Sequence, residues 1–258
     1  MLNFKNINLL SIIILVAITV VNFFAPVSFL VYILVVFCWF GITIFGSFLI
    51  GWNYHFRSFC SNPLIDGNYV SITFDDGPTP EFTPKVLALL EKYQAKATFF
   101  CVGKMVENHP EILKEIIAKG HTVGNHTYSH SHRFGFFSFN KVVDELRRTN
   151  QIIKDITGIE PKLYRPAFGV TNPNIKKALQ ITELQSIGWN KRSLDTTKLS
   201  EEKILNRITN RLNQGDVILL HDTSLKTVKV LEQLLLFLQK NNFQSETVDK
   251  LLNLKPYV

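Results

Sequence analysis

The sequence predicts a parallel α/β domain that follows a pair of membrane-inserted helices. One observation is a charge-free stretch: no Asp, Glu, Lys or Arg occurs between Lys5 and Arg57 of the 258-residue chain. A second is the alternation of short apolar strands with amphipathic helices from residue 69 onward, which favours parallel strands joined by crossover helices. A third is that polar side chains directly follow several strands, as active-site residues do in parallel sheets.

Composition and charge exclude several classes of protein. All 21 acidic residues and 26 of the 28 basic ones (28 minus Lys5 and Arg57) lie from residue 58 onward, so a wholly soluble protein is excluded. The remaining part is large enough for one sizeable core. The net charge is +7, but the basic residues are scattered, which excludes a clustered nucleic-acid-binding face. Three cysteines without a CxxC motif indicate neither a disulfide framework nor a cysteine zinc site.

The N-terminal region, residues 1–57, is predicted to be a membrane hairpin. Its two apolar runs, at about 7–24 and 27–50, would form about 65 Å of helix at 1.5 Å per residue, twice the ~30 Å hydrocarbon core. Pro26 stands between the runs, where a turn is expected. The protein is therefore expected to be a multi-pass integral membrane protein in contact with lipid. The alternative is a cleaved signal peptide, although no A-x-A cleavage site is present.

The elements of the domain follow a linker at residues 58–68, which contains Pro63 and Gly67. Alternating or continuous apolar runs predict strands at 69–74, 97–102, 122–124, 162–165, 185–189 and 216–220, with a weak last strand at 243–247. Amphipathic periodicity, with Pro or Gly at several boundaries, predicts helices at 84–93, 110–120, 140–156, from 173 onward, 201–212 and 227–239. An open sheet and a barrel both satisfy this order, and we take residues 69–258 as one domain.

Candidate catalytic residues are expected at the carboxyl ends of the strands. They comprise two carboxylates after the first strand, histidines after the third and sixth, an arginine after the fourth, and a Trp and an Asp near the fifth. In chain order they are Asp75, Asp76, His126, His130, Arg165, Trp189, Asp195 and His221. Polar residues with only ordinary core or surface roles would not be expected to gather at the same edge of the sheet.

A metal site is one interpretation of His126 and His130. At a spacing of i, i+4, both imidazoles would face the same way on a helical turn, as a pair of metal ligands requires. A third ligand would come from Asp76 or Asp75. The alternative is two solvated or capping histidines. Each remaining residue also has an ordinary interpretation: Asp75 and Asp76 as a turn, Arg165 as a surface arginine, and His221 or Trp189 as core residues. The joint pattern favours a site.

Five motifs in order resemble those of the polysaccharide deacetylases, which are carbohydrate esterase family 4 with its chitooligosaccharide deacetylase homology domain. TFDDGP from Thr73 resembles the first motif, and HTYSH from His126 the metal-binding second. RPAFG from Arg165 resembles the third, the segment from Trp189 to Asp195 the fourth, and LLH from Leu219 the fifth. The resemblance covers most of the domain and none of the hairpin.

This resemblance implies a distorted (β/α)7 barrel and a divalent metal ion, usually Zn²⁺, although Co²⁺, Mn²⁺ or Fe²⁺ would also suit imidazole and carboxylate ligands. It implies that Asp76, His126 and His130 bind the metal. The other implied roles are the general base (Asp75), its orienting partner (Arg165), the general acid (His221), the residue that tunes this acid (Asp195), an oxyanion-binding amide (Phe168), and the walls of a pocket for the acetyl methyl group (Trp189 and Leu219).

Two motifs depart from the family pattern. In the fourth, Arg192 stands three residues after the Trp, where an Asp is usual, and Thr196 follows Asp195 where a second Trp is usual. In the third, Ala167 and Phe168 replace the common Pro-Tyr pair, which keeps the amide and loses a hydroxyl. The implied metal ligands, base and acid are all present.

The expected function is metal-dependent hydrolysis of the N-acetyl or N-acyl group of an amino sugar in a polysaccharide, peptidoglycan or lipid-linked glycan, releasing acetate and a free amine. The alternative is a non-catalytic, membrane-anchored glycan-binding module. Lys5 and Arg57 flank the hairpin, so the positive-inside rule places the domain in the cytoplasm. The commoner family role is extracytoplasmic, so the two indications point to opposite sides of the membrane.

Overall fold

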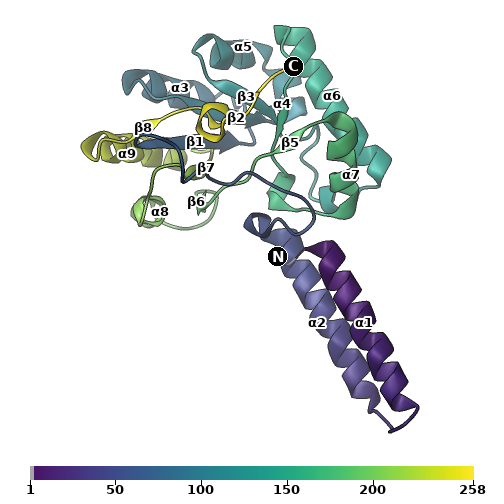
Figure 1. The fold of residues 1–258 in the computed structure, drawn as a ribbon. Helices are drawn as coiled ribbons and strands as arrows, with labels where there is room; N and C mark the ends of the chain where they lie inside the picture. Colours follow the sequence, from purple (N-terminus) through teal and green to yellow (C-terminus); the bar gives the residue numbers. More distant parts are fainter. Residues whose placement is uncertain (1–2) are drawn as a thin grey trace.

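The computed structural model describes residues 3–258 and contains a curved parallel sheet surrounded by helices (Figure 1). The strands are β1 (Tyr69–Asp75), β2 (Ala97–Cys101), β3 (Thr122–Asn125), β4 (Leu163–Tyr164), β5 (Gln185–Ser186), β6 (Lys191–Arg192), β7 (Val217–His221) and β8 (Gln244–Ser245). Their order is β5-β4-β3-β2-β1-β7-β6, and β8 pairs with the start of β1. Every strand pair is parallel, which confirms the predicted fold class.

The barrel is open between β5 and β6. Within residues 3–258 no ladder joins these two strands. Instead, the segment after the hairpin crosses the opening, because Phe59 forms a parallel bridge with Ile187 and Ser61 an antiparallel bridge with Asp216. The predicted strand at 185–189 is shorter than expected, since its pairing with β4 ends at Ser186 and Ile187 pairs with Phe59 instead. The chain then forms β6, which the sequence did not indicate.

Helices cover the outer face of the sheet, with bounds that agree with the predicted ones to within a few residues. They are α3 (Thr83–Lys92), α4 (Gly103–Asn108), α5 (Pro110–Ala118), α6 (Phe139–Thr157), α7 (Pro173–Thr182), α8 (Glu201–Thr209), α9 (Leu225–Lys240) and α10 (Val248–Leu252). Ser138, Asn172, Ser200 and Ser224 cap the last four long helices by accepting a backbone N–H bond. Helices α4 and α10 were not predicted, because six and five residues are too few to establish a helical period.

The main core lies between β1, β2 and β7 and the helices packed on them. Ile72, Phe74 and Leu220 are fully buried, and the ring of Phe74 stacks on that of Phe99 with 5.0 Å between centroids. Continuous apolar strands are expected in a parallel sheet that is covered on its outer face. The central strands are therefore fixed, and the residues at their carboxyl ends are held at one edge of the sheet.

The hairpin consists of α1 (Phe4–Asn22) and α2 (Phe29–Phe48), which pack side by side and project from the domain (Figure 1). Both helices are long and apolar enough to cross a membrane. Only 6% of the most apolar 18-residue segment of each helix is buried. A signal sequence near the N-terminus passes the same test. The two helices are joined by a hydrogen bond from Trp39 Nε1 to Asn8 Oδ1, 2.7 Å long.

The base of the hairpin is attached to the domain through specific contacts. The Tyr54 ring packs against Gly46 of α2, and its hydroxyl lies 3.0 Å from Thr43 Oγ1. The amide of Thr171 donates a 2.9 Å hydrogen bond to the carbonyl oxygen of Ser47, whose hydroxyl lies 2.9 Å from His55 Nε2. These contacts fix the direction in which the hairpin leaves the domain.

Candidate active site

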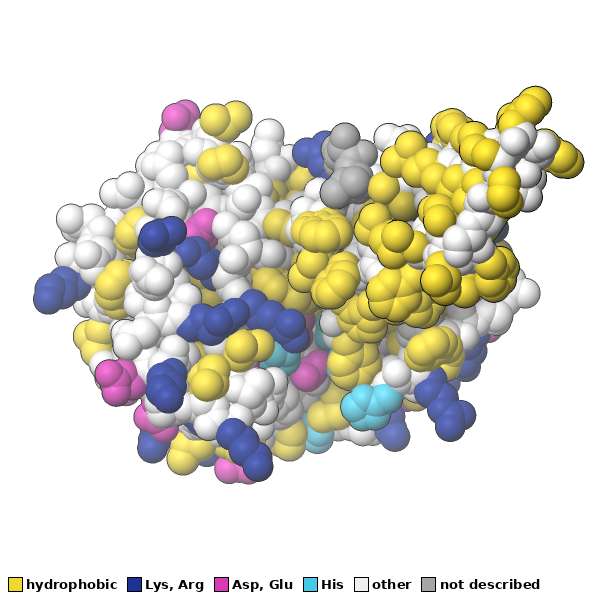
Figure 2. Space-filling model, turned by 90° about the horizontal axis from the view of Figure 1, so that it is seen from below, with side chains coloured by type: hydrophobic (Ala, Val, Ile, Leu, Met, Phe, Trp, Pro, Cys, Tyr) yellow, Lys and Arg dark blue, Asp and Glu magenta, His cyan; other side chains and the backbone are white. Residues whose placement is uncertain are grey.

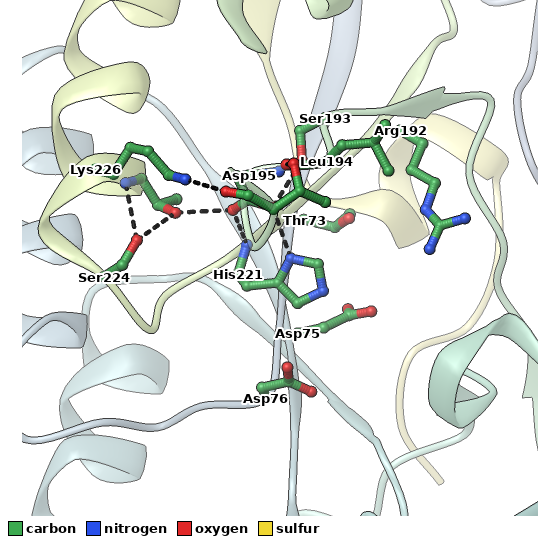
Figure 3. A network of polar contacts seen from close by, with 12 residues as sticks. Thr73, Asp75, Asp76, Arg192, Ser193, Leu194, Asp195, His221, Ser224 and Lys226 are labelled. Carbon is green, nitrogen blue, oxygen red and sulfur yellow. Dashed lines mark hydrogen bonds and ion pairs between the residues drawn. The ribbon is translucent and has the colours of Figure 1, made fainter. Parts of the chain in front are cut away.

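The carboxyl ends of the central strands bring the predicted residues together. Asp75 at the end of β1 is in register with His221 at the end of β7, and His126 directly follows β3. Figure 3 shows Asp75 and Asp76 below the His221 ring, at the same edge of the sheet. Asp76 has a left-handed backbone (φ 74°), and its Oδ1 lies 3.2 Å from His130 Nε2, whereas Asp75 Oδ1 accepts a hydrogen bond from Arg165. The two adjacent acids therefore both lie near His126, but only Asp75 is held by the arginine.

Asp76, His126 and His130 form a cluster suited to a metal ion. One ligand atom from each residue lies within 4.8 Å of the others. Asp76 Oδ1 is 3.4 Å from His126 Nε2 and 3.2 Å from His130 Nε2. The side chains of Asp76 and His130 keep 30% and 20% of their exposure, so solvent reaches the cluster from one side. Two imidazoles, one carboxylate and an open side match the donor set of a catalytic metal site.

Hydrogen bonds and nearby charges determine the orientation and the protonation of the histidines in this cluster. His126 Nδ1 donates to the carbonyl oxygen of Arg165 at 2.9 Å, which leaves Nε2 directed at Asp76. Burial opposes protonation of His126, but the charges of Asp75 and Asp76 outweigh it and raise its pKa. Burial and the neighbouring His126 lower the pKa of His130 to about 4, so this imidazole is neutral at pH 7. A cation and a proton therefore compete for the Nε2 of His126.

The two histidines do not lie on a helical turn, so that part of the prediction was wrong. Residues 126–133 form a loop in which Thr127 and His130 have positive φ angles of 66° and 45°. The buried carboxylate of Glu145 on α6 accepts hydrogen bonds from the amides of Tyr128 and Ser129, at 3.0 and 2.7 Å. This tertiary contact, rather than helical periodicity, turns both imidazoles toward Asp76.

Asp75 is held by a buried arginine. Arg165 is fully buried, and its Nη1 donates to Asp75 Oδ1 at 2.9 Å and to Thr73 Oγ1 at 2.6 Å. Its Nη2 donates to the carbonyl oxygen of Gly188 at 2.9 Å. The interpretation of Arg165 as a surface residue is excluded. Asp75 Oδ2 lies 3.9 Å from His126 Nε2, so the base candidate borders the metal-type cluster.

His221 and Asp195 form a hydrogen-bonded pair on the other side of Asp75 and Asp76 (Figure 3). Asp195 Oδ1 accepts from His221 Nδ1 at 2.8 Å, and Asp195 Oδ2 accepts from the His221 amide and from Thr227 Oγ1, both at 2.8 Å. Burial lowers the pKa of His221, but the hydrogen bond and charge of Asp195 dominate, with help from Asp75 and Asp76, and raise it to about 9. The imidazole is therefore protonated at neutral pH, with Nε2 available to donate.

The remaining predicted residues border the same site. The Phe168 ring lies 4.5 Å from the His130 ring, and the Phe168 backbone is left-handed (φ 57°). Gly169, with φ 70°, packs so closely on the Trp189 ring that a side chain would collide with it. Leu219 is buried two residues before His221, on the same face of β7. Neighbouring supports that sequence reasoning missed are Thr73, Glu145 and Thr227. Of these, Glu145 had a sequence signal, because it is an acid on the apolar stripe of a predicted helix.

Comparisons with known proteins find related sequences and structures. The polysaccharide deacetylase family matches residues 65–187. A peptidoglycan-N-acetylglucosamine deacetylase of Bacillus cereus is 34% identical over 194 residues, which cover 72% of this chain and 89% of that protein. The structure of the peptidoglycan deacetylase PdaC from Bacillus subtilis superposes with a TM-score of 0.69 at 29% identity, covering 74% of this chain and 92% of that one.

A third comparison shows that the fold also occurs without activity. A protein from Bacillus anthracis described as a CE4 family pseudoenzyme matches with a TM-score of 0.68 at 25% identity, over 75% of this chain and 68% of that one. The similarity to the Bacillus cereus deacetylase extends over most of both chains, and the fold and the five motifs agree with it. The chain belongs to the polysaccharide deacetylase family, the CE4 carbohydrate deacetylases.

Proposed function

We propose that this protein is a metal-dependent N-deacetylase of an amino sugar in a glycan such as peptidoglycan or a lipid-linked glycan. The observation that carries the proposal is the complete set of facing groups: the Asp76, His126 and His130 cluster borders Asp75 on one side, and the His221–Asp195 pair faces it from the other. Residues 69–258 would form the catalytic domain, and residues 58–68 would link it to a membrane hairpin at residues 1–57.

Asp76, His126 and His130 would hold the metal ion, which fits their donor atoms and the open side of the cluster. When bound, a divalent ion such as Zn²⁺ activates water and polarises the amide carbonyl. Cobalt, manganese and ferrous ions fit the same ligand types. His126 is fixed for this role by its bond to the Arg165 carbonyl.

The side chains of this chain would move the protons. Asp75, held by Arg165, takes a proton from the water that adds to the carbonyl carbon of the acetamido group. The Phe168 ring packs on His130, and the Phe168 amide would meet the negative charge that develops on the carbonyl oxygen. As the C–N bond breaks, His221 donates its Nε2 proton to the leaving nitrogen. The products are acetate and an amino sugar, and Trp189 and Leu219 would enclose the acetyl methyl group.

The second candidate function is a non-catalytic glycan-binding module, and the likeness to a pseudoenzyme is the observation that favours it. The presence of all three cluster residues, of Asp75 and of His221 favours an enzyme. The deciding experiment measures acetate release from N-acetylchitooligosaccharides by the full-length protein in detergent. We expect release that is lost with a chelator, restored by Zn²⁺, and abolished in Asp75→Asn. An exposed acid of the linker offers the control, Asp66→Asn, which should keep full activity. Glycan binding without acetate release under any metal would favour the binding module.

A further inference from the structure

The hairpin is joined to the wall of the active site. Thr171, whose amide binds the Ser47 carbonyl at the end of α2, lies three residues after Phe168, whose ring packs on His130. Ile50, just after α2, approaches Gly188, whose carbonyl accepts the Arg165 hydrogen bond. Two walls of the site therefore rest on the base of the hairpin, and the site keeps a fixed position relative to the helices.

The lengths of the two helices leave no stalk between a bilayer and the domain. Helix α1 has 19 residues and α2 has 20, which at about 1.5 Å per residue gives about 28 and 30 Å. A hydrocarbon core of ~30 Å requires this whole length. If the hairpin spans a membrane, the residues at its base lie at the lipid–water interface, and the domain rests on that surface.

The active site opens on the face that would meet this surface. Figure 2, seen from below, shows histidine and acidic side chains in a hollow beside the yellow hairpin, with basic side chains next to them. Exposed aromatic side chains lie near the base of the hairpin: Trp52, Phe136 and Phe168 are 42%, 92% and 43% exposed. Phe136 belongs to a turn whose Gly135 carbonyl accepts from Asn172, next to the Thr171–Ser47 contact. Trp is typical of membrane interfaces, and exposed Phe rings beside it are suited to burial at the lipid surface.

An unpaired arginine adds a charge preference to this face. Arg192 on β6 is in register with Leu219 on β7, so its side chain shares the inner face of the sheet with Leu219 and His221. Its guanidinium lies 5.9 Å from the Trp189 ring, at the wall of the proposed acetyl pocket. The side chain is exposed, and none of the ion pairs found among residues 3–258 includes it. Figure 3 shows no contact from its guanidinium to the other residues drawn. A guanidinium in this position suits a phosphate or carboxylate of the substrate.

We infer that the substrate is an anionic glycolipid: an N-acylated amino sugar next to a phosphate-type group, presented by the membrane in which the hairpin is embedded. This inference rests on the proposed deacetylase function and on the hairpin spanning a membrane. Arg192 binds the anionic group beside the amino sugar, and the rigid hairpin base holds the site over the lipid surface. A soluble neutral glycan has no anionic group for Arg192 to bind and is not presented at the lipid surface.

The test uses the full-length protein in lipid nanodiscs and three substrates with the same amino sugar. They are neutral N-acetylchitotetraose, N-acetylglucosamine diphosphate on a short water-soluble alkyl chain, and the same diphosphate on a polyprenyl chain in the nanodisc. Acetate release gives kcat/KM for each. We expect the polyprenyl substrate to be the best and the neutral tetrasaccharide to be the poorest. The two diphosphates separate recognition of the anion from presentation by the bilayer.

Two matched pairs of variants test the two parts of the inference. Arg192→Gln should lower kcat/KM for both diphosphates by about 10- to 100-fold, mainly through KM, and should lower it much less for the neutral substrate. Lys114→Gln, at an exposed lysine of α5, is the charge-matched control. Gly46→Ala, whose added Cβ overlaps the Tyr54 ring at the hairpin base, should slow the polyprenyl substrate more than the two soluble substrates, whereas Gly41→Ala, with nothing near its Cβ, should slow none of them.

The outcomes separate this inference from the proposed function. Equal or faster turnover of the neutral substrate would overturn the inference and leave the deacetylase function standing. An Arg192→Gln variant that slows all three substrates alike would show that Arg192 supports the site and does not recognise an anion. Equal turnover of the soluble and polyprenyl diphosphates would remove the role of the membrane. Failure of all three substrates to release acetate would overturn both proposals.

Discussion

The main-chain carbonyl of Arg165 accepts a hydrogen bond from His126 Nδ1 at 2.9 Å. The guanidinium of the same arginine donates to Asp75 Oδ1, also at 2.9 Å. One buried residue therefore sets the tautomer of a candidate metal ligand and holds the candidate general base. Movement of Arg165 would disturb both groups together, which couples the stability of the site to its chemistry.

Replacing Arg165 should destabilise the fold as well as the site. In Arg165→Met, Asp75 keeps its buried charge without a partner, and we expect the free energy of unfolding to fall by about 3–5 kcal/mol. Chemical unfolding of the full-length protein in detergent measures this loss. The double variant Arg165→Met with Asp75→Asn should recover part of the stability, because no unpaired carboxylate remains. A double variant as unstable as the sum of the two single variants would contradict this account.

Metal binding should distinguish two neighbouring histidines. His130→Ala removes one of three ligand atoms, so zinc content after dialysis should fall to near zero along with activity. His132 lies outside the cluster, and its ring packs on that of Phe168 with 5.3 Å between centroids. His132→Ala should therefore keep its zinc, as measured by elemental analysis. Equal zinc content in the two variants would place the ion elsewhere.

The raised pKa of His221 predicts the alkaline limb of the activity profile. The general acid must be protonated, so kcat/KM should fall as pH rises through the pKa of His221. Without a metal, this pKa lies at about 9 against an ordinary 6.5, and a cation beside Asp76 opposes part of the increase. We therefore expect the limb between pH 6.5 and 9. The fold gains stability from this raised pKa below 6.5 and loses it as pH rises through about 9.

Asp195→Asn supplies the control for this assignment. The amide keeps the shape of the side chain but removes the charge that raises the pKa of His221. The alkaline limb should shift to lower pH, and maximal activity should fall. A limb that stays in place would mean that another group, rather than His221, loses the proton.

The docking of the hairpin should depend on one glycine. A Cβ on Gly46 would overlap the Tyr54 ring, which is 2% exposed, so the ring must shift against its neighbours and the overpacking should cost about 1–3 kcal/mol. In Gly46→Ala we expect faster hydrogen exchange at residues 53–58. The same change at Gly41 meets no atom within 4 Å and should leave the exchange rates at their original values.

Local patterns predicted most elements of the fold. The apolar run at 216–220 became β7, and Pro173 and Gly158 mark the start of α7 and the end of α6. These elements depend on residues that are close together in the sequence. The period of the apolar residues and the positions of Pro and Gly were therefore sufficient to predict them. Strand β6 and helices α4 and α10 were missed because they are short and depend on the surrounding packing.

The candidate site was predictable as a set of residues but not as an arrangement. The spacing of His126 and His130 correctly predicted that both imidazoles point toward one place. The predicted cause, a helical turn, was wrong. The buried carboxylate of Glu145, which follows these histidines by 15 residues or more, fixes the loop. Nothing near Arg165 in the sequence indicated that its side chain would be fully buried against Thr73 and Asp75.

The sequence by itself determined the charge-free hairpin, the order of strands and helices, and the chemical groups at the strand ends, because each depends on residues close together in the chain. Only the tertiary structure decided the direction of those groups and the attachment of the hairpin. The Ser47–Thr171 hydrogen bond joins segments more than 100 residues apart. The opening of the site beside the hairpin likewise depends on how these distant segments pack. Such contacts form only when the whole chain is packed, because burial and hydrogen bonding between distant segments select them.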